Sequence, residues 1–90
     1  MSQKTDLDNI ILTELNSYDK YLQSSVKDNK EFEYLDHIAD KYCFDRKEVI
    51  DKSLDVFNWY MRNDVNEYQA KIMSLYKTHE FILRKCLKTI

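Results

Sequence analysis

The 90-residue chain contains neither glycine nor proline. Glycine supplies the positive φ angles of tight turns and proline fixes the kinks of irregular loops, so a fold built on many hairpins is excluded. The phosphate-binding loop, the dinucleotide fingerprint, the nucleophile elbow and the calcium loop also need glycine, because each depends on its backbone freedom. We therefore expect an all-α protein that is not an enzyme and binds no cofactor and no small-molecule substrate.

Cysteine is scarce, and a long apolar run is missing. Cys43 and Cys86 are the only cysteines and lack paired-ligand spacing, so we expect reduced thiols that serve in packing. The first residues lack the apolar core of a signal peptide, and no stretch approaches the roughly 18 uncharged apolar residues of a membrane span. These absences predict a cytoplasmic protein that has no membrane contact.

Charge is present in quantity but is unevenly distributed. Residues 1–45 carry five Lys and Arg against ten Asp and Glu, whereas residues 46–90 carry nine against six. The net charges of the two halves are therefore −5 and +3. The positive charges of the second half are typical of a solvated surface, or of residues that pair with the acidic half of the same chain. They are also consistent with an anionic partner.

Helix-capping signals recur along the chain. An Asp is followed three residues later by a Glu at positions 28, 45 and 64, and Thr5 to Asp8 is a weaker version of the same pattern. Apolar residues at helical spacing follow each start. The sequence therefore predicts a small bundle in one domain, residues 1–90, with about four helices at 6–22, 29–43, 46–62 and 65–89.

The predicted boundary between the last two helices rests on weak signals. Neither Asn63 nor Asp64 forbids a helix, so one continuous rod is an alternative to a break. Asn63 in the left-handed conformation would end the first of the two helices, and we favour this break. Residues 23–28 form the longest predicted connection.

The last two predicted helices carry more apolar surface than one core contact requires. Apolar residues spread around helix 46–62, and helix 65–89 has a seam of alternating three- and four-residue steps, as in a coiled coil. We therefore expect a homodimer. The predicted partner or dimer interface comprises Val49, Phe57, Trp59, Tyr60, Tyr68, Ile72 and Leu75.

The titratable residues form no convincing reactive set. Glu33, His37 and Asp40 share one helical face, but this spacing arises easily in a charged segment, so we expect a solvated face and no metal. His79 and Cys86 are seven residues apart on one predicted helix, or roughly 10 Å, which rules out direct contact within the chain. A position in the core is favoured for both.

Residues 35–57 contain a patterned helix, turn and helix. An apolar–Ala pair leads through a short turn to a polar cap, an Arg, a Glu and paired aliphatic residues. The matching positions are Ile38-Ala39, Phe44, Asp45-Arg46, Glu48, Val49-Ile50 and Ser53-Leu54. This stretch resembles the two-helix part of ribbon-helix-helix DNA-binding regulators, the Arc, MetJ and CopG type.

The resemblance implies a DNA-reading strand at about residues 22–27. Three features depart from the family pattern: Cys43 replaces the turn glycine, the acidic first helix is an addition, and the alternation at 22–27 has the wrong parity for burial. The same residues also match a helix-turn-helix, in which Lys52 would occupy a core position.

Two functions are consistent with these observations. The first is a small dimeric DNA-binding transcriptional regulator that uses the two-helix unit; its phosphate contacts would be Arg46, Lys47, Lys52, Arg84, Lys85 and Lys88. The alternative is a protein-interaction module of phage or plasmid type, an inhibitor or adaptor that binds a host protein through an exposed helical face. The scarcity of Gly, Ala, Arg and Pro indicates an AT-rich source, for which phages and plasmids are common.

Overall fold

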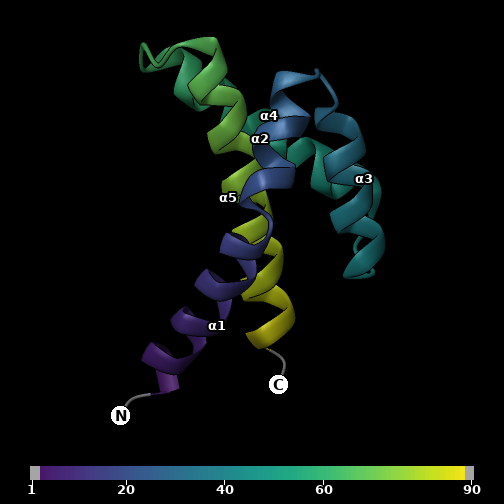
Figure 1. The fold of residues 1–90 in the computed structure, drawn as a ribbon, viewed down its shortest axis with the longest axis vertical. Coiled ribbons are helices and arrows are strands. Elements are labelled where there is room, and N and C mark those ends of the chain that lie inside the picture. The colour runs from purple at the N-terminus through teal and green to yellow at the C-terminus, as the bar shows by residue number, and fades with distance from the viewer. Residues whose placement is uncertain (1–2, 89–90) are drawn as a thin grey trace.

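The computed structural model describes the backbone of residues 3–88 and the side chains of residues 6–87. Within this range the chain is all-helical and contains no strand, as expected. Five helices follow one another along the chain (Figure 1): α1 (Gln3–Ser17), α2 (Asp19–Lys27), α3 (Glu31–Lys41), α4 (Arg46–Arg62) and α5 (Glu67–Lys88). The expected number of about four is low by one, because the predicted first helix is two helices.

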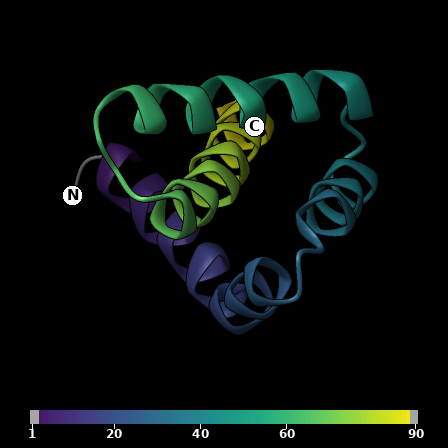
Figure 2. The same cartoon turned by 90° about the horizontal axis from the view of Figure 1, so that it is seen from above.

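Helix α5 lies at the centre of the bundle and contacts each of the other four helices. Viewed from above, α4 and α2 lie on opposite sides of α5, and α3 joins those two sides (Figure 2). Helix α1 extends beside the C-terminal half of α5, away from α3 (Figure 1). The molecule is therefore elongated, with principal dimensions of 38 × 26 × 23 Å.

Two apolar clusters hold these helices together. The larger one lies between α2, α3, α4 and α5, and its buried members are Leu22, Val26, Tyr34, Leu35, Ile38, Ala39, Val49, Leu75 and Ile82. The smaller one joins Ile11 and Leu15 of α1 to Leu83 of α5. Because α1 belongs only to the smaller cluster, its attachment depends on a short strip of α5 and on the polar contacts described below.

Three turns take a left-handed residue without using glycine. Asn29, Cys43 and Asp64 have φ angles of 58°, 57° and 62°. In each turn, the residue after the left-handed one donates its backbone N–H to the carbonyl of the residue five positions before it. This bond satisfies a carbonyl that is free at the helix end. These bonds run from Lys30 to Ser25, from Phe44 to Ala39 and from Val65 to Tyr60, at 2.7, 2.8 and 3.1 Å. Asn and Asp tolerate this conformation, whereas Cys43 carries the steric cost of its Cβ.

The break between the last two helices is confirmed, but the left-handed residue is Asp64. Asn63 keeps a φ angle of −103°, and its side chain instead donates to the Trp59 carbonyl at 2.7 Å. Helix α5 begins after Asn66, whose side chain accepts from the Gln69 N–H at 2.8 Å. The predicted cap at Asp64 is therefore displaced by two residues.

Of the other predicted caps, only Asp45 is confirmed. Its carboxylate accepts a hydrogen bond from the Glu48 N–H at 3.1 Å, which fixes the start of α4. Asp28 ends α2 and does not cap α3, whose N-cap residue is Lys30 without a side-chain hydrogen bond. Thr5 lies inside α1 and not at its start.

The predictions for residues 6–28 need correction. The single helix expected at 6–22 is interrupted at Tyr18, and the expected connection at 23–28 is mostly helix α2. The strand that the family resemblance places at 22–27 is absent, because these residues bury Leu22, Ser25 and Val26 at helical spacing. Burial of a serine on this face explains why the segment lacked a clear apolar pattern.

Candidate functional site

An open cleft of about 410 Å³ lies between α4 and α5. Its lining residues, which we call the cationic cleft, are Lys52, Val56, Trp59, Tyr60, Lys77, Glu80, Phe81 and Arg84. Trp59 is 53% exposed, and its ring meets the Tyr60 ring edge to face at a centroid distance of 5.0 Å. An aromatic pair in a hollow, with one ring exposed and the other partly buried, is an arrangement that suits ligand or partner contact.

Two lysines lie over the Phe81 ring of this cleft: Lys52 belongs to the lining, and Lys85 lies outside it. The Nζ atoms of Lys52 and Lys85 lie 4.7 and 5.0 Å from the ring centre, on α4 and α5 respectively. Neither lysine forms an ion pair with a carboxylate among the described residues. Their charges are consequently available to an anionic group that enters the cleft.

Arg84 is also in the cleft, but two carboxylates hold it. Its guanidinium donates to Asp8 of α1 and to Glu80, both at 3.0 Å, and these bonds raise the pKa of Arg84. Glu80 also lies 3.8 Å from the ammonium of Lys77. With Lys85 included, four positive charges face two negative ones, so the cleft carries a surplus of two positive charges.

The solvent face of α4 beside the cleft is acidic. Glu48, Asp51 and Asp55 are exposed at spacings of three and four residues, which places them on one face of the helix. None of the three has an ion-pair partner among residues 6–87. A phosphate backbone that approached along α4 would therefore meet repulsion beside the cationic cleft.

The six cations expected to contact nucleic acid do not form a single site. Lys52 and Arg84 line the cationic cleft, and Lys85 contacts its Phe81 ring from outside the lining. Arg46 is bonded to Asp36 and lines a different hollow with Glu33 and Asp40, and Lys47 is exposed near the start of α4. The side chain of Lys88 lies outside the described residues.

The residues expected at a partner surface also separate. Val49 and Leu75 are buried in the core of the chain itself, and Ile72 packs against that core, so their apolar character is explained within one protomer. Trp59 and Tyr60 line the cationic cleft, Tyr68 is exposed, and Phe57 lines a separate apolar groove with Phe32 and Leu54.

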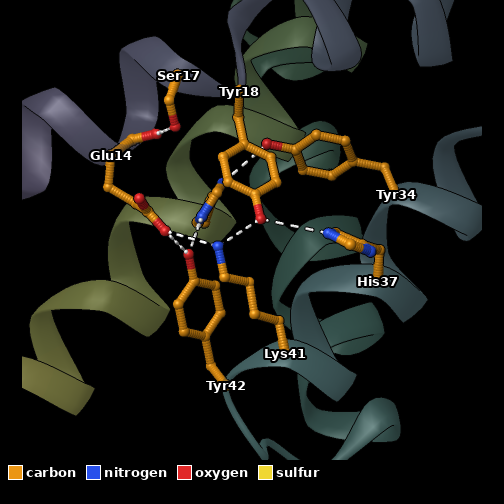
Figure 3. A network of polar contacts seen from close by, with 8 residues as sticks. Glu14, Ser17, Tyr18, Tyr34, His37, Lys41 and Tyr42 are labelled. Carbon is orange, nitrogen blue, oxygen red and sulfur yellow. Dashed lines mark hydrogen bonds and ion pairs between the residues drawn. The ribbon is translucent and has the colours of Figure 1, made fainter.

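A second feature, a network of polar side chains between α1, α3 and α5, was not predicted (Figure 3). At its centre His79 is fully buried, as its expected core position requires. Its Nδ1 lies 2.8 Å from the Tyr34 hydroxyl and its Nε2 lies 3.1 Å from the Tyr42 hydroxyl. Glu14 accepts hydrogen bonds from Tyr42 at 2.5 Å and from Lys41 at 3.0 Å.

The direction of each bond in this network follows from Glu14. The pKa of Glu14 is lowered because Tyr42 and Lys41 both donate to it, so its carboxylate can only accept. The Tyr42 hydrogen therefore points to Glu14, and the Tyr42 oxygen accepts from His79 Nε2–H. His79 Nδ1 is then a lone pair, and Tyr34 donates to it.

Burial keeps His79 neutral. It lowers the pKa of the imidazole to about 4, against a smaller opposite effect of Glu14. Both nitrogens are occupied by tyrosines and the ring is closed to solvent, so His79 does not present a base to a substrate. The network joins α1, α3 and α5 through side-chain hydrogen bonds.

The outer end of the network reaches the surface. Lys41 donates to the Tyr18 hydroxyl at 2.7 Å, and the bonds to Tyr18 and to Glu14 raise the pKa of Lys41. Tyr18 in turn lies 3.3 Å from His37 Nε2 (Figure 3). Sequence reasoning missed these partners, although a histidine on an apolar stripe needs partners and tyrosines on other stripes could supply them.

Protein-family models, curated proteins and solved structures were compared with the chain. None matches it. In the described part of the chain, no group of three His, Cys, Asp or Glu side chains is placed to hold a metal ion. The same part has no helix that is both long and apolar enough to cross a bilayer. The cationic cleft is therefore the best-supported candidate site.

Proposed function

We propose that this protein is a protein-interaction module whose cationic cleft binds an acidic segment of a partner protein that carries an aromatic or large apolar side chain. The observation that carries this proposal is the position of Lys52 and Lys85 on the Phe81 ring, next to the exposed Trp59. An acidic segment would pair its carboxylates with these lysines. Its apolar side chain would pack against Trp59 and Phe81.

The size of the cleft supports a short peptide segment as its occupant. A volume of about 410 Å³ holds one or two side chains and not a folded domain. The acidic face of α4 along one side disfavours a long polyanion and tolerates a short segment that presents its charges only to the cleft. An inhibitor or adaptor of a host protein is the role that such a module would serve.

Trp59 provides the test, because it is the only tryptophan in the chain and lies in the cleft. We expect its fluorescence to change on titration with a synthetic Asp- and Glu-rich peptide that contains one Phe and no Tyr or Trp. The same peptide without the Phe should bind more weakly. Affinity should fall as salt rises, because the charges of the cleft are exposed.

A matched pair of double variants controls for net charge. Lys52→Ala with Lys85→Ala should weaken peptide binding about 2- to 30-fold, the range expected for two exposed ion pairs. Lys20→Ala with Lys27→Ala removes the same charge from exposed positions on α2 and should leave the affinity unchanged. Equal effects of the two double variants would refute the cleft as the binding site.

The second candidate function is the dimeric DNA-binding regulator suggested by residues 35–57. It is supported by the helix–turn–helix unit of α3 and α4, by the Asp45 cap, and by the exposed Lys47 near the start of α4. Titration of Trp59 with a duplex and with an oligothymidylate separates the two functions. Binding of either nucleic acid tighter than the peptide, with a steep salt dependence, would reverse our ranking.

A further inference from the structure

The two histidines of the chain occupy opposite environments on one hydrogen-bonded network. His79 is fully buried on α5, whereas His37 is exposed on α3. Tyr18 lies between them: its hydroxyl is 3.3 Å from His37 Nε2, and its ring meets the His79 ring edge to face at 4.7 Å. The exposed His37 is therefore an internal control for any effect that depends on burial of the His79 imidazole.

The buried imidazole has no place for a second proton. Its Nδ1 is the acceptor of the Tyr34 hydroxyl, and Tyr34 is itself fully buried. A proton on Nδ1 would face the Tyr34 hydrogen, which would have to turn away from its acceptor. A charged imidazole would also lose the hydration that it has in water, which is costly in an apolar surrounding.

The Tyr18 ring packs edge to face against the His79 ring, and its hydroxyl accepts a hydrogen bond from Lys41, which is partly exposed. Tyr18 is also the residue that separates α1 from α2. A movement of the Tyr18 ring away from His79 would open one side of the imidazole and would also change the junction of the two helices. Hydration of His79 and the position of α1 are therefore mechanically linked.

The charged groups that act on His79 come from two helices. Glu14 of α1 favours a proton on the imidazole, and Lys41 and His37 of α3 oppose it. The remaining titratable groups in contact with the ring are the phenols Tyr18, Tyr34 and Tyr42. Burial outweighs the attraction of Glu14, so the closed arrangement holds His79 without a proton.

We propose that His79 is an acid sensor: uptake of one proton by its imidazole displaces the Tyr18 ring and releases the α1–α2 junction from α3 and α5. The release would separate Glu14 from Lys41 and Tyr42 and expose the small apolar cluster on α5. It would also remove Asp8 from Arg84 at the cationic cleft, which would gain one positive charge.

The pH dependence of opening follows from the difference in the His79 pKa between the closed and open forms. In an open state His79 would regain its ordinary pKa of 6.5, compared with about 4 in the closed state. The population of the open form relative to the closed form therefore rises as pH falls below 6.5. It stops rising below about pH 4, where His79 is protonated in both forms. Between about pH 7.5 and about pH 5, the equilibrium constant for opening should rise about 30-fold.

Hydrogen exchange of the full chain, corrected for the intrinsic pH dependence of exchange, tests this proposal. Amides of α1 and of the Tyr18 junction should lose protection about 30-fold over that pH range, while amides of α4 keep theirs. The range stops above the ordinary pKa of carboxyl groups, so titration of Glu14 contributes less than about a twofold change. Simultaneous opening of α1 and α4 would overturn the proposal, because it would mean global unfolding.

Two variants separate the sensor from a merely structural role. His37→Gln, the control, should keep the full pH response of α1. Tyr18→Ala leaves His79 in place but removes the ring that packs on it, so NMR titration should show a raised His79 pKa, and α1 should open at a higher pH than in the unaltered chain. Titration of His79 near pH 4 in the unaltered chain, with α1 protection unchanged down to that pH, would refute the linkage.

These readouts do not involve a binding partner. Failure of the peptide to bind the cationic cleft would therefore leave the sensor untouched, and the reverse also holds.

Discussion

Removal of the Tyr34 hydroxyl should destabilise the protein out of proportion to the one atom lost. Tyr34→Phe keeps the ring, which is fully buried in the main apolar cluster. It deletes only the hydroxyl that donates to His79 Nδ1 at 2.8 Å. Because His79 is also fully buried, no solvent water can replace the lost donor without a change in packing.

The magnitude follows from the burial of both partners. A buried acceptor that loses its donor costs about 1–3 kcal/mol, the desolvation penalty of the unsatisfied group. In a domain of this size the melting temperature should fall by about 5–20 °C. A matched control is Tyr76→Phe, because Tyr76 packs against both apolar clusters and its hydroxyl makes no hydrogen bond among the described residues. The control should change stability by less than about 0.5 kcal/mol.

Urea unfolding at about pH 7.5, followed by far-ultraviolet circular dichroism, measures both variants. We expect Tyr34→Phe to lower the midpoint with an unchanged slope, and Tyr76→Phe to leave both unchanged. A double-mutant cycle with His79→Leu isolates the bond, since in that background the Tyr34 hydroxyl has lost its acceptor. Equal costs of Tyr34→Phe with and without His79, or equal costs of the two Tyr→Phe changes, would refute the assigned network.

Four further predictions follow from other contacts. Asp45→Ala removes the cap of α4 and should cost about 1 kcal/mol in thermal unfolding. Cys43→Gly should stabilise by up to about 1 kcal/mol, because glycine adopts the φ angle of 57° without a Cβ clash, whereas Cys43→Val should destabilise. Glu14→Gln should flatten the acid limb of the stability curve: the pKa of Glu14 is lowered, so its contribution is present above about pH 4.5 and is lost as pH falls below that value. Sedimentation at tens of micromolar should show a dimer that Leu54→Ser weakens, because Leu54 and Phe32 border an exposed apolar groove; a monomer in the unaltered chain would contradict the expected homodimer.

Local chemistry was enough to predict part of the fold. The Asp45 carboxylate accepts from the Glu48 N–H, and α4 begins where the spacing of these two residues predicts its start. The break after Arg62 was also predicted, although the left-handed residue is Asp64 rather than Asn63. Asp and Asn have similar turn preferences, so sequence alone could not choose between two neighbours.

The interruption at Tyr18 had no local signal. The apolar stripe continues through this residue, and neither glycine nor proline marks a break. The break exists because α1 and α2 pack against different parts of α5, the first on the small cluster at Leu83 and the second on the main cluster. A continuous helix would lie along only one of these directions.

The sequence predicted several residues of the cationic cleft as contact residues, but it did not predict that they form one site. Lys52 and Lys85 were among the expected anion-binding residues and Trp59 among the expected contact residues. Their meeting point, the Phe81 ring, depends on how α4 crosses α5. The ion pair of Arg46 with Asp36, which separates Arg46 from this group, depends on how α4 packs against α3.

By itself, the sequence determined the all-helical class, the absence of glycine-dependent motifs and the core position of His79, because each follows from residue type and short-range spacing. The Asp-to-Glu spacing at Asp45 recurs at Asp28 and Asp64, neither of which caps a helix start, so packing decided which of these signals became a cap. Only the tertiary structure decided what surrounds His79. Its partners Tyr34 and Tyr42 lie 45 and 37 residues away along the chain. No local pattern encodes such a distance, since the bonds form only when α3 and α5 pack against each other around one buried ring.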